Sequence, residues 1–246
     1  MKRIVMKYIN RVLALFAIVS LSFACGEEYQ YFPDISKQDG AKFKFVHAAT
    51  DTTGIEFTVN GVLASPGGNG IGYFYAFPVL DYAVQSTGNL NLNIQNPATD
   101  TTDAVLMVST SVSAQTNDYF TVALVGVSGS YEAVAISDNM SAIPFDDKSY
   151  VRVINFIHDS PNGVSLELTN ALGTSVVADK ILFKEGSAFV AVEPGSYSSI
   201  KLLDSNSGNT LSSAASSRRT LLPNRVYTFY GKGSFANASI DRMYNR

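Results

Sequence analysis

Hydrophobic and polar residues alternate with a period of two over much of this 246-residue chain. Residues 42–45 read Lys-Phe-Lys-Phe, residues 55–59 read Ile-Glu-Phe-Thr-Val, and residues 89–94 read Asn-Leu-Asn-Leu-Asn-Ile. Residues 164–168 repeat the pattern with Val-Ser-Leu-Glu-Leu. Such alternation predicts β-strands that bury one face and expose the other face to water.

Turn-forming residues separate these segments, and no helical period appears beyond the first 25 residues. The turns include Asn60-Gly61, Pro161-Asn-Gly163, Pro194-Gly195 and Asn206-Ser-Gly208. Many short strands joined by such turns predict an all-β fold of two tandem immunoglobulin-like antiparallel β-sandwich domains. The chain has one cysteine and no tryptophan, so the Cys…Trp…Cys core of antibody domains cannot form.

An internal repeat sets the expected number of domains. The strand Phe43–Val46 and the turn after it recur at Val151–Ile154, with an offset of 108. Asn117–Val122 recurs as Asn224–Phe229, with an offset of 107. We therefore expect a leader at 1–24, a spacer at 25–40, one sandwich at 41–140, a linker at 141–148 and a second sandwich at 149–246.

The first 25 residues have the order of a secretory signal peptide. Four basic residues precede an apolar run, Val12–Ala24, and the run ends at Cys25. This run is shorter than the roughly 20 residues that a membrane-spanning helix needs. The segment Leu21-Ser-Phe-Ala-Cys25 resembles a bacterial lipobox, which implies that Cys25 becomes the lipid-carrying first residue. The alternatives are an ordinary signal peptide or an uncleaved N-terminal anchor.

The residues after Cys25 also carry a resemblance. Gly26-Glu27-Glu28-Tyr29 is similar to the acidic signal with which Bacteroidetes-type bacteria export lipoproteins to the outer face of the outer membrane. The simpler interpretation is that two acidic residues solvate a tether. Which leaflet of that membrane carries the protein, the inner or the outer, stays open.

Net charge narrows the expected partners. Loss of residues 1–24 removes four of 18 basic residues and none of 21 acidic ones, which leaves a formal charge of −7. Without a basic cluster, nucleic acid is not an expected partner. Contact with a membrane is expected through the lipid on Cys25.

Several motifs together resemble the domain-of-unknown-function family 4397. They are Phe45-Val-His-Ala48 with the Asp-containing turn after it, the strand end Val59-Asn-Gly61, and Glu193-Pro-Gly-Ser-Tyr197. The resemblance spans residues 41–246 and implies secreted or lipid-anchored β-sandwich domains, often in tandem, without an established activity. The second copy departs from the pattern with Asn155 in the place of His47.

Aromatic residues supply the candidate contact site. Tyr73, Tyr75 and Phe77 share one face of an expected strand, and Phe74 lies on the other face. Exposed aromatic rings stack on sugars or dock on proteins. The competing interpretation is that the neighbouring domain or the aromatic residues of the spacer cover this strand.

No metal or cofactor is expected. His47 and His158 are the only histidines, and a zinc site needs three or four ligands, so we expect histidines that hydrogen-bond a turn. Asp204–Thr210 has oxygen donors at alternate positions, as calcium loops do, but lacks the distal glutamate. A hairpin turn with Gly208 at positive φ explains the segment and is the preferred interpretation, and calcium near Asp204 is the alternative left open.

The chain is not expected to be an enzyme, because it has no Gly-x-Ser-x-Gly motif and no thiol other than Cys25. The expected function is that of a lipid-anchored cell-envelope protein with a non-catalytic binding or structural role, its partner a glycan or an envelope protein. One alternative is an accessory glycan-binding subunit of an outer-membrane nutrient-uptake complex. The other is an enzyme that acts on envelope polymers.

Overall fold

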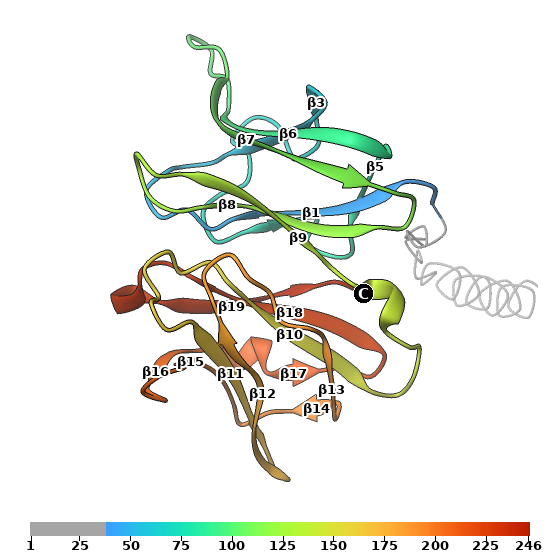
Figure 1. Cartoon of the computed structure of the whole chain (residues 1–246), viewed down its shortest axis with the longest axis vertical. Coiled ribbons are helices and arrows are strands. Elements are labelled where there is room, and N and C mark those ends of the chain that lie inside the picture. Colours follow the sequence, from blue (N-terminus) through green and yellow to red (C-terminus); the bar gives the residue numbers. More distant parts are fainter. Residues whose placement is uncertain (1–37) are drawn as a thin grey trace, which may run out of the picture. The chain divides into compact units, whose positions relative to one another are not determined.

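The computed structural model describes residues 38–246, and strands dominate this range (Figure 1). The strands of the first half are β1 (Ala41–His47), β2 (Glu56–Val59), β3 (Val62–Leu63), β4 (Ala76–Phe77), β5 (Ala83–Gln85), β6 (Gly88–Asn96), β7 (Val105–Ala114), β8 (Tyr119–Val125) and β9 (Glu132–Ser137). The strands of the second half are β10 (Ser149–Asn155), β11 (Val164–Asn170), β12 (Gly173–Ile181), β13 (Val190–Val192), β14 (Gly195–Ser196), β15 (Ser199–Asp204), β16 (Thr210–Ser213), β17 (Thr220–Leu221), β18 (Arg225–Lys232) and β19 (Ser239–Tyr244). Three short 3₁₀ helices are η2 (Met140–Ala142), η3 (Ser216–Arg218) and η4 (Phe235–Asn237).

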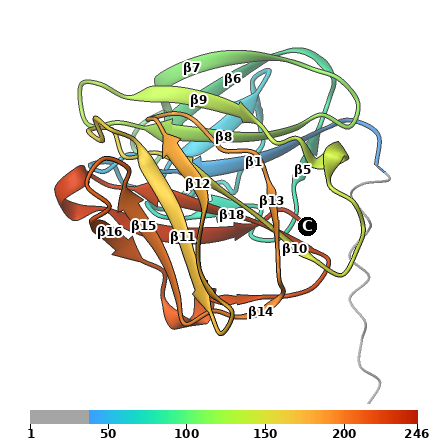
Figure 2. The same cartoon turned by 60° about the horizontal axis from the view of Figure 1, so that its bottom comes forward.

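Each half forms a sandwich of two sheets. In the first sandwich, outer sheet 1 has the order β3-β2-β6-β7, and inner sheet 1 has the order β4-β1-β8-β9 with β5 also paired to β1. In the second sandwich, inner sheet 2 has the order β13-β10-β18-β19 and outer sheet 2 has the order β12-β11-β15-β16 (Figure 2). The predicted all-β fold with two sandwiches is therefore confirmed.

The two sandwiches share one topology, as the internal repeat predicts. Strand β1 pairs with β8 so that Phe43 lies opposite Phe120, and β10 pairs with β18 so that Val151 lies opposite Tyr227. These registers reproduce the offsets of 108 and 107 in the sequence. Both pairings are parallel, whereas the other pairings are antiparallel. The alternating pattern does not reveal strand direction, so the sequence could not predict the parallel pairs.

Apolar side chains between the sheets form a separate core in each sandwich. In the first, Phe45 and Phe57 come from facing sheets, and their ring centroids lie 4.9 Å apart. In the second, Val153, Leu166 and Phe229 are fully buried. The Asn-Leu alternation of β6 behaves as predicted, since the leucines are buried and Asn89 and Asn91 are exposed.

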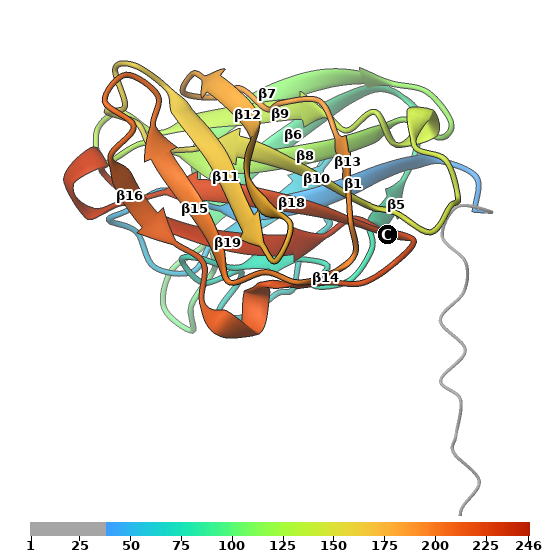
Figure 3. The ribbon, with the colours of Figure 1, turned by 90° about the horizontal axis from the view of Figure 1, so that it is seen from below.

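The outward face of inner sheet 1 packs against the outward face of inner sheet 2, and we call this contact the junction. A third apolar cluster fills part of it, with Val46 and Ala123 from the first sandwich and Ile154, Tyr230 and Met243 from the second. The order of layers is thus outer sheet 1, inner sheet 1, inner sheet 2 and outer sheet 2. Figure 3 views the stack from the side of outer sheet 2.

This packing overturns one expectation. Lys42 and Lys44 alternate with Phe43 and Phe45, which predicts that both lysines point into water; instead both are fully buried. Lys44 Nζ donates a hydrogen bond to the carbonyl of Pro78 at 3.0 Å and lies 5.2 Å from the ring centroid of Tyr82. The polar face of β1 is covered because a second sandwich lies on it.

Within residues 38–246, no helix has the length and apolar character of a membrane span.

The buried Lys44 predicts a pH dependence of stability. Burial lowers the pKa of Lys44 from 10.5 to about 7, against the opposing effect of the Asp138 and Asp81 carboxylates. Between these two values the unfolded chain binds more protons than the folded chain, so the free energy of unfolding rises as the pH rises from 7 towards 10.5. Each pKa unit corresponds to about 1.4 kcal/mol.

The measurement is urea unfolding of the wild type and Lys44→Met at pH 6 to 10. Over this range, we expect the free energy of unfolding of the wild type to rise by a few kcal/mol relative to that of Lys44→Met. Equal pH profiles of the two proteins would contradict the burial of the Lys44 amine and the lowered pKa that follows from it.

Candidate functional site at the junction

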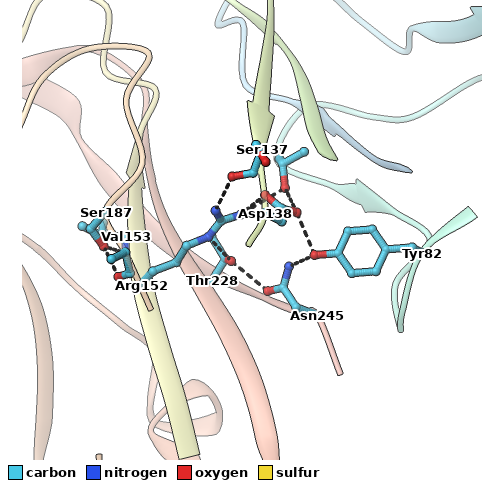
Figure 4. A network of polar contacts seen from close by, with 10 residues as sticks. Tyr82, Ser137, Asp138, Arg152, Val153, Ser187, Thr228 and Asn245 are labelled. Carbon is cyan, nitrogen blue, oxygen red and sulfur yellow. Dashed lines mark hydrogen bonds and ion pairs between the residues drawn. The ribbon is translucent and has the colours of Figure 1, made fainter. Parts of the chain in front are cut away.

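The junction holds a buried ion pair between the two sandwiches (Figure 4). Asp138 directly follows β9, and Arg152 lies in β10; their side chains are 0% and 2% exposed. Thr121 Oγ1 and Tyr82 OH both donate to Asp138 Oδ2, at 2.8 and 2.7 Å. Each carboxylate oxygen of Asp138 thus has a partner, which a buried charge requires.

The hydrogen bonds around this pair close into a ring that crosses the junction. Arg152 Nε donates to Thr228 Oγ1 at 2.9 Å, and Thr228 Oγ1 donates to Asn245 Oδ1 at 2.7 Å. Asn245 Nδ2 donates to Tyr82 OH at 2.5 Å, and Tyr82 donates onward to Asp138. We call these residues, with Thr121, the junction network.

Burial fixes which groups of the junction network donate hydrogen bonds and which accept them. It raises the pKa of Tyr82 well above its ordinary value of 10.0, and the nearby Asp138 adds to this rise. The Tyr82 hydroxyl therefore stays protonated and donates to Asp138. The guanidinium of Arg152 also lies 4.5 Å from the ring centroid of Phe189. These contacts position the two inner sheets relative to each other.

The predicted aromatic residues do not share a strand face. Strand β4 covers only Ala76–Phe77, and Tyr73 and Phe74 form a turn before it. Phe77 packs against the first core, and the Tyr73 ring lies edge-on to His47 at 5.6 Å. Tyr75 is 69% exposed. Of the three predicted contact residues, Tyr75 is thus the one whose side chain is available to a ligand.

Phe74, which the sequence placed on the opposite face, connects the two sandwiches. Its φ of 80° is in the left-handed region, which a bulky residue rarely adopts. The carbonyl of Phe74 accepts hydrogen bonds from Tyr230 OH at 3.0 Å and from Lys232 Nζ at 3.2 Å. Lys232 Nζ also lies 3.8 Å from the centroid of the Phe74 ring. The second sandwich therefore holds this strained turn in place.

A crevice of about 70 Å³ lies beside this turn, and we call it the junction crevice. Its walls are Phe74, Tyr75, Ala76 and Val79 from the first sandwich and Arg218, Tyr230, Asp241, Arg242, Met243 and Tyr244 from the second. Sequence reasoning predicted Tyr75 but none of the residues opposite it. They come from η3, β18 and β19, and no sequence spacing signals that these elements meet β4.

Charged groups of the second sandwich converge on the junction crevice. Arg218 Nε lies 3.2 Å from Asp241 Oδ1, and Lys232 Nζ lies 3.6 Å from Asp241 Oδ2. Burial lowers the pKa of Lys232 to about 8, with Asp241 opposing the shift, so the amine is mostly protonated at neutral pH. The buried Arg242 guanidinium lies 4.8 Å from the ring centroids of both Tyr227 and Tyr244. Its Nη1 donates to the carbonyls of Arg218 and Thr220 and its Nη2 to Tyr244 OH, whereas its Nε has no hydrogen-bond partner.

A second concave surface lies in the second sandwich, away from the junction crevice. It has a volume of about 540 Å³ and lies between β12 and β13, with Leu168 and Tyr197 among its lining residues. Leu172 and Val176 are exposed at its rim. Strand β12 pairs with β11 on one edge, and β11 is its only partner among the described strands.

His47 is the last residue of β1 and contacts the loop that follows it, whereas His158 lies in a turn. His47 Nε2 lies 2.6 Å from the carbonyl oxygen of Thr53, so this nitrogen carries the proton and donates it. Burial lowers the pKa of His47, and its Nδ1 is buried without a partner. His158 Nε2 lies 4.0 Å from Asp159. Within residues 38–246, no three His, Cys, Asp or Glu side chains form a group that could hold a metal ion.

The segment that starts at Asp204 forms the hairpin turn between β15 and β16. Asp204 Oδ2 accepts hydrogen bonds from the backbone N–H of Ser207 at 3.1 Å and from its hydroxyl at 2.6 Å. These bonds hold the pKa of Asp204 below its ordinary value. Gly208 has a φ of 71°, as the turn interpretation predicts. Cys25, the predicted site of lipidation, lies outside the described residues.

The sequence of residues 41–162 matches the family model "Domain of unknown function (DUF4397)". This match confirms the resemblance for the first sandwich and the start of the second; for the remaining residues it stays a prediction. No curated protein matches the chain.

Two solved structures are similar to this chain in fold. One is the family CBM26 module CBMbc from Eubacterium rectale Amy13K in complex with maltoheptaose, with 7% identity and a TM-score of 0.24; the alignment covers 84% of this chain and 96% of that one. The other is the fimbrial anchor protein Mfa2 from Porphyromonas gingivalis, with 9% identity and a TM-score of 0.25, covering 85% and 98%. At these values neither structure carries an argument about ligand or partner.

Two ion pairs join the sandwiches, and the structure predicts that they contribute very different amounts to the free energy of unfolding. Arg152→Met leaves Asp138 buried without its cation, and we expect the free energy of unfolding to fall by about 3–5 kcal/mol. Lys184 Nζ and Glu132 Oε2, 2.8 Å apart, form the matched exposed pair. Lys184→Met should cost less than about 1 kcal/mol, because solvent screens this pair. Urea unfolding measures both, and equal costs would contradict the structural role of the network.

Proposed function

We propose that this protein is a lipid-anchored protein of the bacterial cell envelope with a non-catalytic binding or structural role. In this proposal, Cys25 carries the lipid and the two sandwiches act together as one body. The observation that carries the proposal is the junction network, in which buried charged groups join the two sandwiches. A buried ion pair with all its partners in place favours one relative position of the two sandwiches, which suits a binding or structural role.

The chemistry of the described residues supports a role without catalysis. Asp138 and Arg152 pair with each other inside the junction, and Lys44 donates to the carbonyl of Pro78. Catalytic groups need a reacting atom within hydrogen-bond reach and a cleft that admits it. The charged groups of the junction instead bond to one another and to the backbone.

Sequence features support the location. The basic start, the apolar run and the small residue before Cys25 favour export and lipid modification. Several acyl chains on one cysteine anchor a protein stably, because each buried CH₂ contributes about 0.8 kcal/mol. Glu27 and Glu28 support export to the cell surface. Residues 26–37 lie outside the described range and supply the connection in this proposal.

The lipid anchor is tested by Cys25→Ser in the full chain. We expect the wild type to incorporate a radiolabelled fatty acid and to sediment with membranes. The variant should lose the label and should be recovered as soluble protein or as the uncleaved precursor. Labelling that persists in Cys25→Ser, or an unlabelled wild type, would refute the anchor.

Surface exposure is tested by adding protease to intact cells. If the protein lies on the outer face of the outer membrane, the protease removes it while a periplasmic control protein survives. Full protection of the protein, with digestion after the cells are lysed, would place it inside the envelope.

A further inference from the structure

The junction crevice combines a stacking platform with an excess of cationic over anionic side chains. Tyr75 is 69% exposed at its wall, next to Phe74 and the exposed Val79. Exposed aromatic rings present a flat apolar face with a polar rim. The C–H face of a pyranose ring fits such a platform, since its hydroxyl groups point outward from the ring and remain free for hydrogen bonds.

The charges around the platform favour an anion. Arg218, Lys232 and Arg242 provide three cations at or beside the crevice, and Asp241 is the carboxylate among its lining residues. Arg242 is buried at the crevice wall, where Nη1 donates to the carbonyls of Arg218 and Thr220 and Nη2 donates to Tyr244 OH, so its charge is held by neutral groups. This local excess of positive charge occurs in a chain whose net charge is negative.

The backbone supports the same assignment independently. Phe74 adopts a φ of 80°, and contacts from Tyr230 and Lys232 hold it there. Strained residues persist where the surrounding structure enforces them, and they cluster at ligand sites. Here the strained turn places Tyr75 opposite Arg218 and Asp241, on elements of different sandwiches.

We propose that the junction crevice binds an anionic saccharide, with one sugar ring stacked on Tyr75 and its carboxylate facing Arg218. This inference rests on the proposed binding role and specifies its ligand class. Arginine binds carboxylates in a bidentate geometry, and Asp241 holds the guanidinium in position while it accepts hydroxyl donors. The ligand would contact both sandwiches, so the site requires the junction to be intact.

The test is calorimetric titration of the full-length mature protein, in mild detergent, with four uronate or sialyl oligosaccharides. These are oligomers of galacturonate, glucuronate and mannuronate and a sialylated trisaccharide, each compared with its methyl ester. The ester keeps the ring and removes the charge. We expect saturable binding of at least one acid form, at least about tenfold weaker binding of its ester, and weakening by added salt.

Variants locate the site. Tyr75→Ala and Arg218→Met should each weaken binding about tenfold, whereas Tyr75→Phe keeps the ring and should bind normally. Phe145→Ala is the matched aromatic control, since Phe145 is 74% exposed and lies beneath the Arg246 guanidinium, outside the crevice walls. Lys184→Met is the matched control for an exposed ion pair. Thermal unfolding of each variant verifies that it is folded.

Four results would overturn the inference. The first is that the folded wild type binds none of the acid forms, and the second is that it binds acid and ester equally. The third is binding that survives Tyr75→Ala and Arg218→Met together, and the fourth is an acidic octapeptide that binds as tightly as the sugars. Lipid labelling of Cys25 is measured separately. A labelled protein that binds none of the sugars therefore contradicts this inference alone, and an unlabelled protein that binds them contradicts the anchor alone.

Discussion

The burial of the Arg152–Asp138 pair between two sheets is the constraint on which the rest of the structure depends. A buried charge without a partner costs several kcal/mol, so each partner requires the other sandwich to be in place. Tyr82 and Thr121 donate to Asp138, and Arg152 donates to Thr228 and to the carbonyl of Ser137. Asn245 links Thr228 to Tyr82. The apolar part of the junction, around Val46 and Ile154, buries a further area between the same two sheets. Hydrophobic burial supplies driving force, and the polar ring selects one relative position of the sheets.

This arrangement changes what the repeat means. Two copies of one sandwich have the same strand order, yet their inner sheets carry different charged residues at the junction. Lys44 stands on β1 of the first copy, and Arg152 stands at the equivalent position of β10 in the second. Both are cations on the faces through which the copies meet, and both lie near the Asp138 carboxylate. The junction crevice is a consequence, since its walls come from both copies and exist only where they meet.

Sequence reasoning recovered the local structure and missed what depends on the contact between the copies. The alternation in β6 and the turn at Asp204 were predicted because they depend on neighbours in the chain and on one core. Lys42 and Lys44 were predicted to face water, because a polar strand face has the same pattern whether water or a second sheet covers it. Phe74 was assigned by parity to a strand, but a positive φ places it in a turn. Of the crevice residues, Tyr75 was found through its aromatic neighbours; Arg218 and Asp241 belong to short elements far away in the sequence.

The central claim is that the two sandwiches unfold as one unit because the junction network couples them. Differential scanning calorimetry of the purified protein tests this claim most directly. A coupled body predicts one transition in which the calorimetric and van't Hoff enthalpies agree. Two resolved transitions in the wild type, each with the enthalpy of about half the chain, would contradict the coupling and with it the account of a single rigid body.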